Sequence, residues 1–199
     1  MVNNHIKQLA SQKYRCGQYA LTEGQIERLL LSFTNLQDKA CIALSISTGI
    51  RREDIVKIKR NDFDPENGTI TFYESKKKRT RTIYIPSPET IQLLIMHLNS
   101  CRQSIWLFPS PRKSGDVSKN HVSGRHMYDV LNQQLELIGL ERRPYHALRA
   151  SCYKLCQKAG WSSRKACELL GDTLTVAELH YNAPSIEEMH AIAVERPLF

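Results

Sequence analysis

The sequence predicts a mainly α-helical fold with a small antiparallel β-sheet, in the α+β class. Apolar residues recur at helical spacing through most of the 199-residue chain. One pair of segments rich in β-branched and aromatic residues flanks a short basic run, as the strands of a hairpin do. A hydrophobic content of 41% is ordinary for a globular protein, and this length is sufficient for one buried core.

The first elements are predicted by polarity and helix-end signals. Residues 1–20 are polar without a sustained period, so we expect an arm or linker before a domain over 21–184. Thr22-Glu23-Gly24-Gln25 has the pattern of a capping box, and the apolar stripe that follows predicts a helix. A second helix over 38–48 is apolar nearly all round, which predicts burial, and it should end at Gly49. A short helix from Arg51 through Ile58 follows.

The remaining elements begin with the hairpin. Segments 69–73 and 81–85 are its predicted strands, and the charged tip between them is free to enter a DNA groove. A loop is predicted over 108–115, where proline, serine and glycine gather. We expect six further helices, at 88–99, 118–138, 147–159, 163–170, 175–181 and 186–194.

Charge and hydropathy narrow the class of partner. The formal net charge of +8 favours an anionic partner, and nucleic acid is the natural candidate. No apolar run reaches the length of a bilayer span, and the start Met1-Val2-Asn3-Asn4-His5 lacks the apolar core of a signal peptide. We therefore expect no membrane association and a cytoplasmic protein with access to the genome.

Metal ligation is not indicated by the cysteines or the carboxylates. The six cysteines include no Cys-x-x-Cys pair, and Cys152 and Cys156 lie four apart on one predicted helix, which is typical of core packing. We interpret the cysteines as reduced and mostly buried thiols. No cluster of carboxylates suits two magnesium ions, which disfavours a metal-dependent nuclease.

A set of basic residues and one tyrosine point to chemistry on a phosphodiester. The set comprises Arg51 in Thr48-Gly49-Ile50-Arg51, Lys76 in the hairpin run, His146-Ala147-Leu148-Arg149, and Tyr181. Fixed guanidinium groups neutralise the charge that gathers on phosphate oxygens in the transition state. A tyrosine oxygen can attack phosphorus when a nearby base takes its proton, and a lysine among other cations can protonate the leaving oxygen.

In this order and spacing the segments resemble the catalytic domain of the tyrosine recombinase (phage integrase) family, from about Leu21 to the C-terminus. The similarity also includes an Asp-containing segment at 61–63, a Leu-Gly-x box at 170–172, and a tyrosine nine residues after that x. The resemblance implies that Arg51 and Arg149 clamp the scissile phosphate. It also implies that Lys76 is the general acid, His146 the acid/base partner and Tyr181 the nucleophile.

Two features depart from the family pattern or leave its register open. Lys77 and Lys78 directly follow Lys76, so a slip of one or two residues would change the assigned acid. Asp172, which we include among the catalytic candidates, stands where the family usually has His or Trp, and a carboxylate there repels a phosphate unless it is protonated or turned away. Six further cations are predicted to contact DNA: Lys77, Lys78, Arg79, Arg81, Arg112 and Lys113.

The resemblance predicts a site-specific recombinase or integrase that cleaves and rejoins double-stranded DNA through a covalent 3′-phosphotyrosine, without a metal or nucleotide cofactor. Alternatives are a catalytically impaired relative that regulates recombination and a type IB topoisomerase-like enzyme. Family members usually carry an N-terminal clamp domain, so we expect either a minimal recombinase or a separated catalytic domain. Residues 185–199 are predicted to form a helix and tail that pack either on their own core or on a neighbour in a DNA-bound homotetramer.

Overall fold

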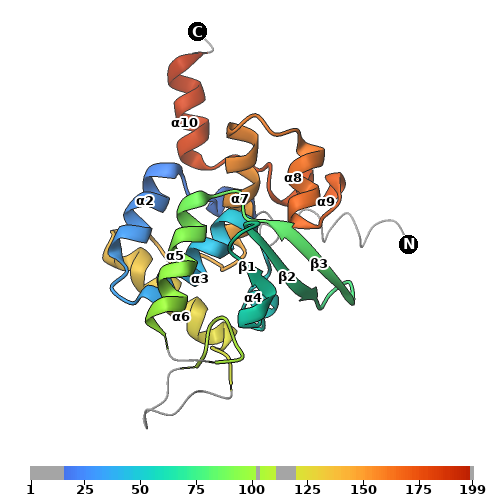
Figure 1. The fold of residues 1–199 in the computed structure, drawn as a ribbon. Helices are drawn as coiled ribbons and strands as arrows, with labels where there is room; N and C mark the ends of the chain where they lie inside the picture. The colour runs from blue at the N-terminus through green and yellow to red at the C-terminus, as the bar shows by residue number, and fades with distance from the viewer. Residues whose placement is uncertain (1–15, 102–103, 111–119, 198–199) are drawn as a thin grey trace, which may run out of the picture.

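Helix α3 (Leu36–Thr48) lies at the centre of the protein, and helices from both halves of the chain pack against it (Figure 1). The computed structural model describes residues 16–101, 104–110 and 120–197. Every position of α3 from Ala40 to Ile46 is buried, as an apolar circumference predicts. The fold is mainly helical with a three-stranded antiparallel sheet, which confirms the predicted class.

The N-terminal helices follow their end signals closely. In α2 (Glu23–Ser32), Thr22 and Gln25 form the predicted capping box. Helix α3 begins two residues before its predicted start because the Asn35 side chain accepts a hydrogen bond from the Asp38 amide at 3.1 Å and caps it. It ends at Gly49, whose φ of 64° is left-handed.

Helix α4 (Arg52–Ile55) is shorter than the predicted helix through Ile58. The chain leaves the helix because its next residues pair with another segment. The Ile58 carbonyl accepts from the Leu107 amide at 2.9 Å, and Lys59 forms a bridge with Trp106. A 3-10 helix, η3 (Arg60–Asp62), follows.

The sheet contains the predicted hairpin and one strand that sequence periodicity did not predict. Strands β2 (Thr69–Glu74) and β3 (Arg79–Tyr84) pair antiparallel, with Glu74 opposite Arg79. The predicted second strand, 81–85, therefore started two residues too late. The extra strand β1 (Phe63–Asp64) has two residues, too few for an alternating pattern, and pairs with the start of β2.

In the described part of the C-terminal half, six helices lie close to their predicted positions: α5 (Pro88–Ser100), α6 (Gly124–Leu137), α7 (Ala147–Lys158), α8 (Ser163–Leu170), α9 (Leu174–His180) and α10 (Ile186–Glu195). The predicted helix 118–138 starts outside the described residues, and within them residues 120–123 are not helical. Ser123 caps α6, and before it the Val122 amide pairs with the Phe108 carbonyl at 2.9 Å, which holds that residue outside the helix.

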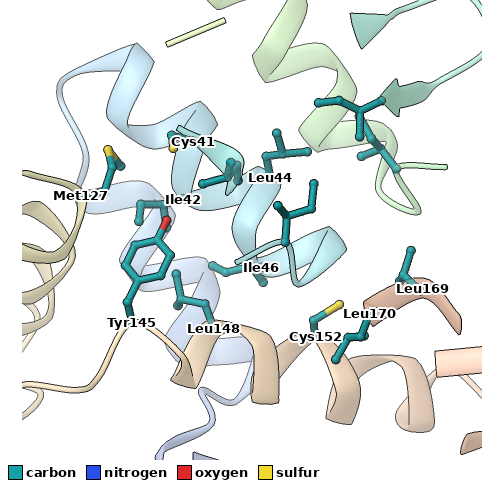
Figure 2. Close-up of a cluster of buried hydrophobic side chains, with 14 of the residues drawn as sticks. Cys41, Ile42, Leu44, Ile46, Met127, Tyr145, Leu148, Cys152, Leu169 and Leu170 are labelled. Atoms are coloured by element: carbon teal, nitrogen blue, oxygen red, sulfur yellow. The ribbon is translucent and has the colours of Figure 1, made fainter. Parts of the chain in front are cut away.

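The buried core joins the first helices to the last ones (Figure 2). Side chains of α3, including Ile42, Leu44 and Ile46, belong to the same buried cluster as Leu148 of α7 and Leu170 of α8. Four of the six cysteines are buried, in agreement with the predicted core packing: Cys41, Cys152, Cys156 and Cys167. The elements that carry the candidate site residues are thus fixed to one another by packing.

A 3-10 helix, η2 (Cys16–Tyr19), lies within the predicted arm and packs against α7. Gly17 also allows η2 to lie against the segment after α9, because a Cβ atom there would lie 2.4 Å from the Tyr181 carbonyl oxygen. The following Leu21 is buried, and its amide donates to Ser151 Oγ at 2.7 Å. Over the described residues, no helix combines the length and apolar character that crossing a bilayer requires.

Candidate active site

The Asp172 carboxylate is the point at which the predicted site residues meet. Arg51 Nη2 donates to Asp172 Oδ1 at 2.9 Å, and Arg149 Nη2 donates to Asp172 Oδ2 at 2.6 Å. The Tyr181 hydroxyl donates to the same Oδ2 at 2.6 Å. The structure therefore brings both predicted arginines and the predicted nucleophile onto one anionic group, although they lie up to 130 residues apart in sequence (181 − 51).

Arg149 is the most enclosed of these cations. It lies in the first turn of α7, and only 3% of its side chain is exposed. Besides Asp172, it donates through Nη1 to the Gly49 carbonyl and through Nη2 to the Leu170 carbonyl. Backbone acceptors at two helix ends, α3 and α8, thus fix the orientation of the guanidinium group.

Arg51 is the N-cap residue of α4, directly after the turn that ends α3. Its Nη1 donates to Glu74 Oε1 at 2.6 Å, while Nη2 contacts Asp172. The side chain is 18% exposed, so it is more accessible than that of Arg149. The two arginines approach Asp172 from different elements, Arg51 from the turn before α4 and Arg149 from α7.

The position of Asp172 follows from the end of α8. Gly171 has φ 71°, and the Asp172 amide donates back to the Cys167 carbonyl at 3.0 Å, as in a Schellman turn. Burial opposes ionisation of the carboxyl group, but the Arg149 charge, the hydrogen bonds from Tyr181 and Arg149, and the Arg51 charge together lower its pKa to about 2. Asp172 is therefore an anion at neutral pH.

Tyr181 follows the last residue of α9 and is 1% exposed. Its hydroxyl donates to Asp172 and accepts from Arg149 Nε at 2.9 Å. Burial raises the pKa of the phenol above its ordinary value; the Arg149 charge opposes the shift, and the Asp172 charge reinforces it. Tyr181 is thus a neutral phenol at pH 7 and needs a base before it can act as a nucleophile.

His146 immediately precedes α7, three residues before Arg149, and its Nε2 lies 3.3 Å from the Tyr181 hydroxyl. The rings of the two residues are 5.9 Å apart between centroids. Desolvation by the surrounding protein, followed by the Arg149 charge, lowers the pKa of His146 below its usual 6.5, although the residue as a whole is exposed. A neutral imidazole at this distance can accept a proton from the phenol.

The hairpin contributes cations that differ in their surroundings. Lys76 is exposed and lines a cavity together with Arg51, His146 and Arg149. Lys77 Nζ instead donates to the Gly171 carbonyl at 2.6 Å. These surroundings favour Lys76 as the residue able to reach a substrate in the cavity, which stays a prediction.

The other cations predicted to contact DNA also differ in whether the protein already supplies them with an acceptor. Lys78 forms the exposed turn, with φ 51°. Arg79 Nε donates to Glu74 Oε2 at 3.1 Å, and Arg81 Nη2 donates to the Glu168 carbonyl at 2.5 Å. Arg112 and Lys113 lie outside the described residues. The hairpin cations therefore hold β2 and β3 against the end of α8 as well as offering charge at the surface.

The cavity beside the arginines has a volume of about 840 Å³. Seven basic residues contribute to its lining: Arg51, Arg52, Lys76, Arg142, Arg143, His146 and Arg149. Asp172 and Tyr181 do not belong to this lining, so the two arginines stand between the cavity and the carboxylate. A basic cavity next to a tyrosine suits an anionic substrate that is attacked by the phenol.

Sequence analysis did not predict the role of Glu74. Its side chain is 1% exposed and accepts from both Arg51 and Arg79. Burial is the largest single influence on the pKa of the Glu74 carboxyl group, and it raises that pKa. The two hydrogen bonds and the neighbouring arginine charges together outweigh burial, so the pKa is lowered. The signal was present, because strand alternation places Glu74 on the same buried face as Ile70 and Phe72.

Metal ligation receives no support in this region. Across residues 16–101, 104–110 and 120–197, no three His, Cys, Asp or Glu side chains come together as a metal site requires. In the Asp-containing segment at 61–63, the Asp62 side chain has a local structural role. Its Oδ2 accepts a hydrogen bond from the Lys59 amide at 3.1 Å and caps η3.

Comparisons with known proteins agree with this geometry. The family model described as "Phage integrase family" matches residues 20–183. Tyrosine recombinase XerA of Pyrococcus furiosus is 26% identical over 154 residues, which cover 76% of this chain and 52% of the relative. Tyrosine recombinase XerC of Syntrophus aciditrophicus is 28% identical over 166 residues, covering 79% and 52%. The chain spans about half the length of these curated relatives.

Solved structures share the fold at lower identity. A crystal structure of XerA recombinase matches with a TM-score of 0.71 and 18% identity, over 90% of this chain and 66% of that one. XerH site-specific recombinase, bound to palindromic difH substrate in a post-cleavage complex, matches with a TM-score of 0.67 and 20% identity, over 90% and 54%. These matches show that the helical arrangement around α3 and the small sheet is that of a recombinase fold.

Proposed function

The chain belongs to the phage integrase family, and on that premise we propose that it is a site-specific DNA recombinase that cleaves and rejoins strands through Tyr181. One observation supports this proposal above the others. Arg51, Arg149 and Tyr181 all form hydrogen bonds with Asp172, and Tyr181 also lies within hydrogen-bonding distance of Arg149 and His146. A phosphodiester is the substrate that suits two guanidinium groups beside a buried phenol.

Tyr181 is the nucleophile in the proposed cleavage step. Its oxygen forms a bond with the scissile phosphorus while the bond from phosphorus to the 5′ oxygen breaks. Arg51 and Arg149 neutralise the charge on the non-bridging oxygens through the transition state. The product is a 3′-phosphotyrosine, and attack of a 5′ hydroxyl on it reverses the step and rejoins a strand.

Two proton transfers accompany this exchange. His146 Nε2, at 3.3 Å, takes the phenolic proton from Tyr181. Lys76, in the lining of the basic cavity, gives a proton to the departing 5′ oxygen.

A nicked suicide substrate tests this function. When cleavage occurs next to a nick, the short product diffuses away and the covalent complex accumulates. We expect a protein band of slower mobility on denaturing electrophoresis after incubation with DNA that carries the protein's recombination site. Genomic fragments selected by binding provide that site. Specific binding of such fragments without any covalent band would contradict the enzymatic proposal.

A second candidate function is that of a DNA-binding relative that regulates recombination without cleaving. The observation that favours it is Asp172, which occupies the Arg51 and Arg149 donors and is anionic. On this alternative, the protein binds recombination sites and forms no adduct with any nicked substrate. The same electrophoresis experiment therefore separates the two functions.

We also propose that the protein assembles as a homo-oligomer on duplex DNA through α10. Large apolar side chains of this helix are exposed, including Met189 at 54%, Ile192 at 54% and Val194 at 69%. The helix projects from the body next to α7 (Figure 1), and Lys154 of α7 pairs with Glu188 at its base. A ten-residue helix with an uncovered apolar face gains stability by docking on a neighbouring surface.

Deletion of residues 185–199 tests this assembly. We expect the truncated protein to keep its fold and its binding to a single DNA site, while the slower complex of several protomers disappears from native gels. The replacement of Arg196 alone by Ala provides a control that leaves the apolar face intact. Identical complexes before and after deletion would contradict docking of α10 on a partner.

A further inference from the structure

We propose that Asp172 is an internal ligand that occupies the binding position of the scissile phosphate in the free protein. Substrate binding then requires the carboxylate to leave the two arginines. This inference rests on the proposed function for the identity of the substrate, and its geometric basis is independent of that function. It assigns to Asp172 the control of when the site accepts an anion.

The donors of Arg149 provide the first argument. All three of its nitrogens already have acceptors: Nε contacts Asp172 and Tyr181, Nη1 contacts the Gly49 carbonyl, and Nη2 contacts Asp172 and the Leu170 carbonyl. The backbone acceptors belong to the ends of buried helices and remain in place. Among the contacts of Arg149, those to Asp172 are therefore the ones that a phosphate can replace.

The shape of the site provides the second argument. The carboxylate bridges Arg51 through Oδ1 and Arg149 through Oδ2, at 2.9 Å and 2.6 Å. A phosphodiester would use its two non-bridging oxygens in the same way, since both groups present paired anionic oxygens to guanidinium donors. Only 7% of the Asp172 side chain is exposed, and its carboxylate fills the position between the two Nη2 atoms.

Charge provides the third argument. A carboxylate and a phosphate at adjacent positions repel each other strongly in a site of restricted solvent access. Glu74 cannot relieve this repulsion, because it is an additional buried anion that already contacts Arg51. Simultaneous occupancy of the arginines by Asp172 and a phosphate is therefore disfavoured.

Displacement of Asp172 also changes the surroundings of the nucleophile. In the free protein the Tyr181 hydroxyl donates to Asp172 at 2.6 Å, whereas His146 Nε2 lies at 3.3 Å. When the carboxylate leaves, His146 becomes the remaining acceptor for the phenolic proton. Arrival of the phosphate and deprotonation of Tyr181 are thus linked through one side chain.

The test measures the binding of inorganic phosphate to the full chain by calorimetry, without DNA. Asp172→Asn removes the charge and keeps the shape, and Asp172→His introduces the residue usual in the family. We expect each variant to bind phosphate at least about tenfold more tightly than the wild type, because an adjacent like charge is removed. Asp129→Asn is the matched control, since it removes a carboxylate that pairs with Arg125 at 2.8 Å on the surface of α6.

A double variant, Asp172→Asn with Arg51→Gln, locates the phosphate. The gain in affinity should be lost in this variant if phosphate binds between the arginines. A gain that persists there, or equal affinities for the wild type and both single variants, would overturn the proposal. If Asp172→Asn fails to fold by circular dichroism, Asp172→His decides the comparison, and tight phosphate binding by the wild type overturns the proposal by itself.

The covalent assay on a nicked substrate separates this inference from the proposed function. We expect Asp172→His to form the adduct faster than the wild type. If phosphate affinity rises as expected while no variant forms an adduct, the internal ligand is supported and the recombinase function is refuted. If adducts form and phosphate affinity does not change, the function stands and the internal ligand is refuted.

Discussion

Replacement of Gly49 by alanine tests whether the backbone turn after α3 holds the site. Gly49 has φ 64°, and its carbonyl accepts from Arg149 Nη1. An added Cβ would lie 3.0 Å from Leu170 Cγ and 3.4 Å from Arg149 Cγ. Two effects therefore lower the unfolding free energy of the variant. One is the strain of a left-handed backbone at alanine, and the other is the contact of the new Cβ with residues that position the active site.

Gly139 provides a matched comparison, because its φ of 77° is also left-handed and a Cβ there would meet nothing within 4 Å. The backbone cost in Gly139→Ala is about 1–2 kcal/mol. In Gly49→Ala an overpacking cost of about 1–3 kcal/mol adds to the same backbone cost. We therefore expect Gly49→Ala to lose about 2–5 kcal/mol of unfolding free energy, against about 1–2 kcal/mol for the control.

Urea unfolding followed by circular dichroism measures both free energies, and the initial rate of covalent adduct formation measures the site. We expect Gly49→Ala to slow the adduct about tenfold to a hundredfold, because small displacements of Arg149 misalign the reacting groups. Gly139→Ala should keep the wild-type rate. Equal losses of stability and equal rates in the two variants would refute the view that this turn positions Arg149.

Three further predictions concern the chemistry. Lys76→Ala should slow cleavage by about a hundredfold or more, with rescue by a 5′-bridging sulfur leaving group that needs no proton; rescue in Lys77→Ala instead would move the general acid by one residue. Arg51→Lys and Arg149→Lys should each slow the adduct by roughly a hundredfold, and a normal rate in either would remove that arginine from the site. His146 should stay neutral down to its lowered pKa, so protonation should reduce the rate only below pH 6.5; a decline centred between pH 7 and 8 would exclude His146 as the base.

Much of the fold could be predicted because it depends on local signals. The capping box at Thr22 and the glycine that ends α3 determine helix ends through neighbouring residues alone. The start of α6 and the end of α4 were predicted less well. Both depend on pairing between distant segments, such as Val122 with Phe108 and Ile58 with Leu107, and local periodicity contains no information about such pairs.

The candidate site could be predicted as a set of residues but not as a network. Motif order identified Arg51, Arg149 and Tyr181, and the structure brings them together. The partners of Asp172 could not be predicted, because they come from other elements of the fold, and its hydrogen bond from Arg51 spans 121 residues. Sequence reasoning treated Asp172 as a source of repulsion toward phosphate, whereas in the free protein the same charge is stabilised by both arginines.

The identity of the covalently bound residue tests the central proposal most directly. Tyr181→Phe removes one hydroxyl, and Tyr153→Phe removes a hydroxyl from the neighbouring tyrosine, whose ring lies 5.7 Å away between centroids. With a nicked substrate, we predict that Tyr181→Phe binds DNA with nearly unchanged affinity and forms no covalent adduct, while Tyr153→Phe forms it. An adduct of wild-type yield in Tyr181→Phe would contradict the account, because the nucleophile would then lie elsewhere.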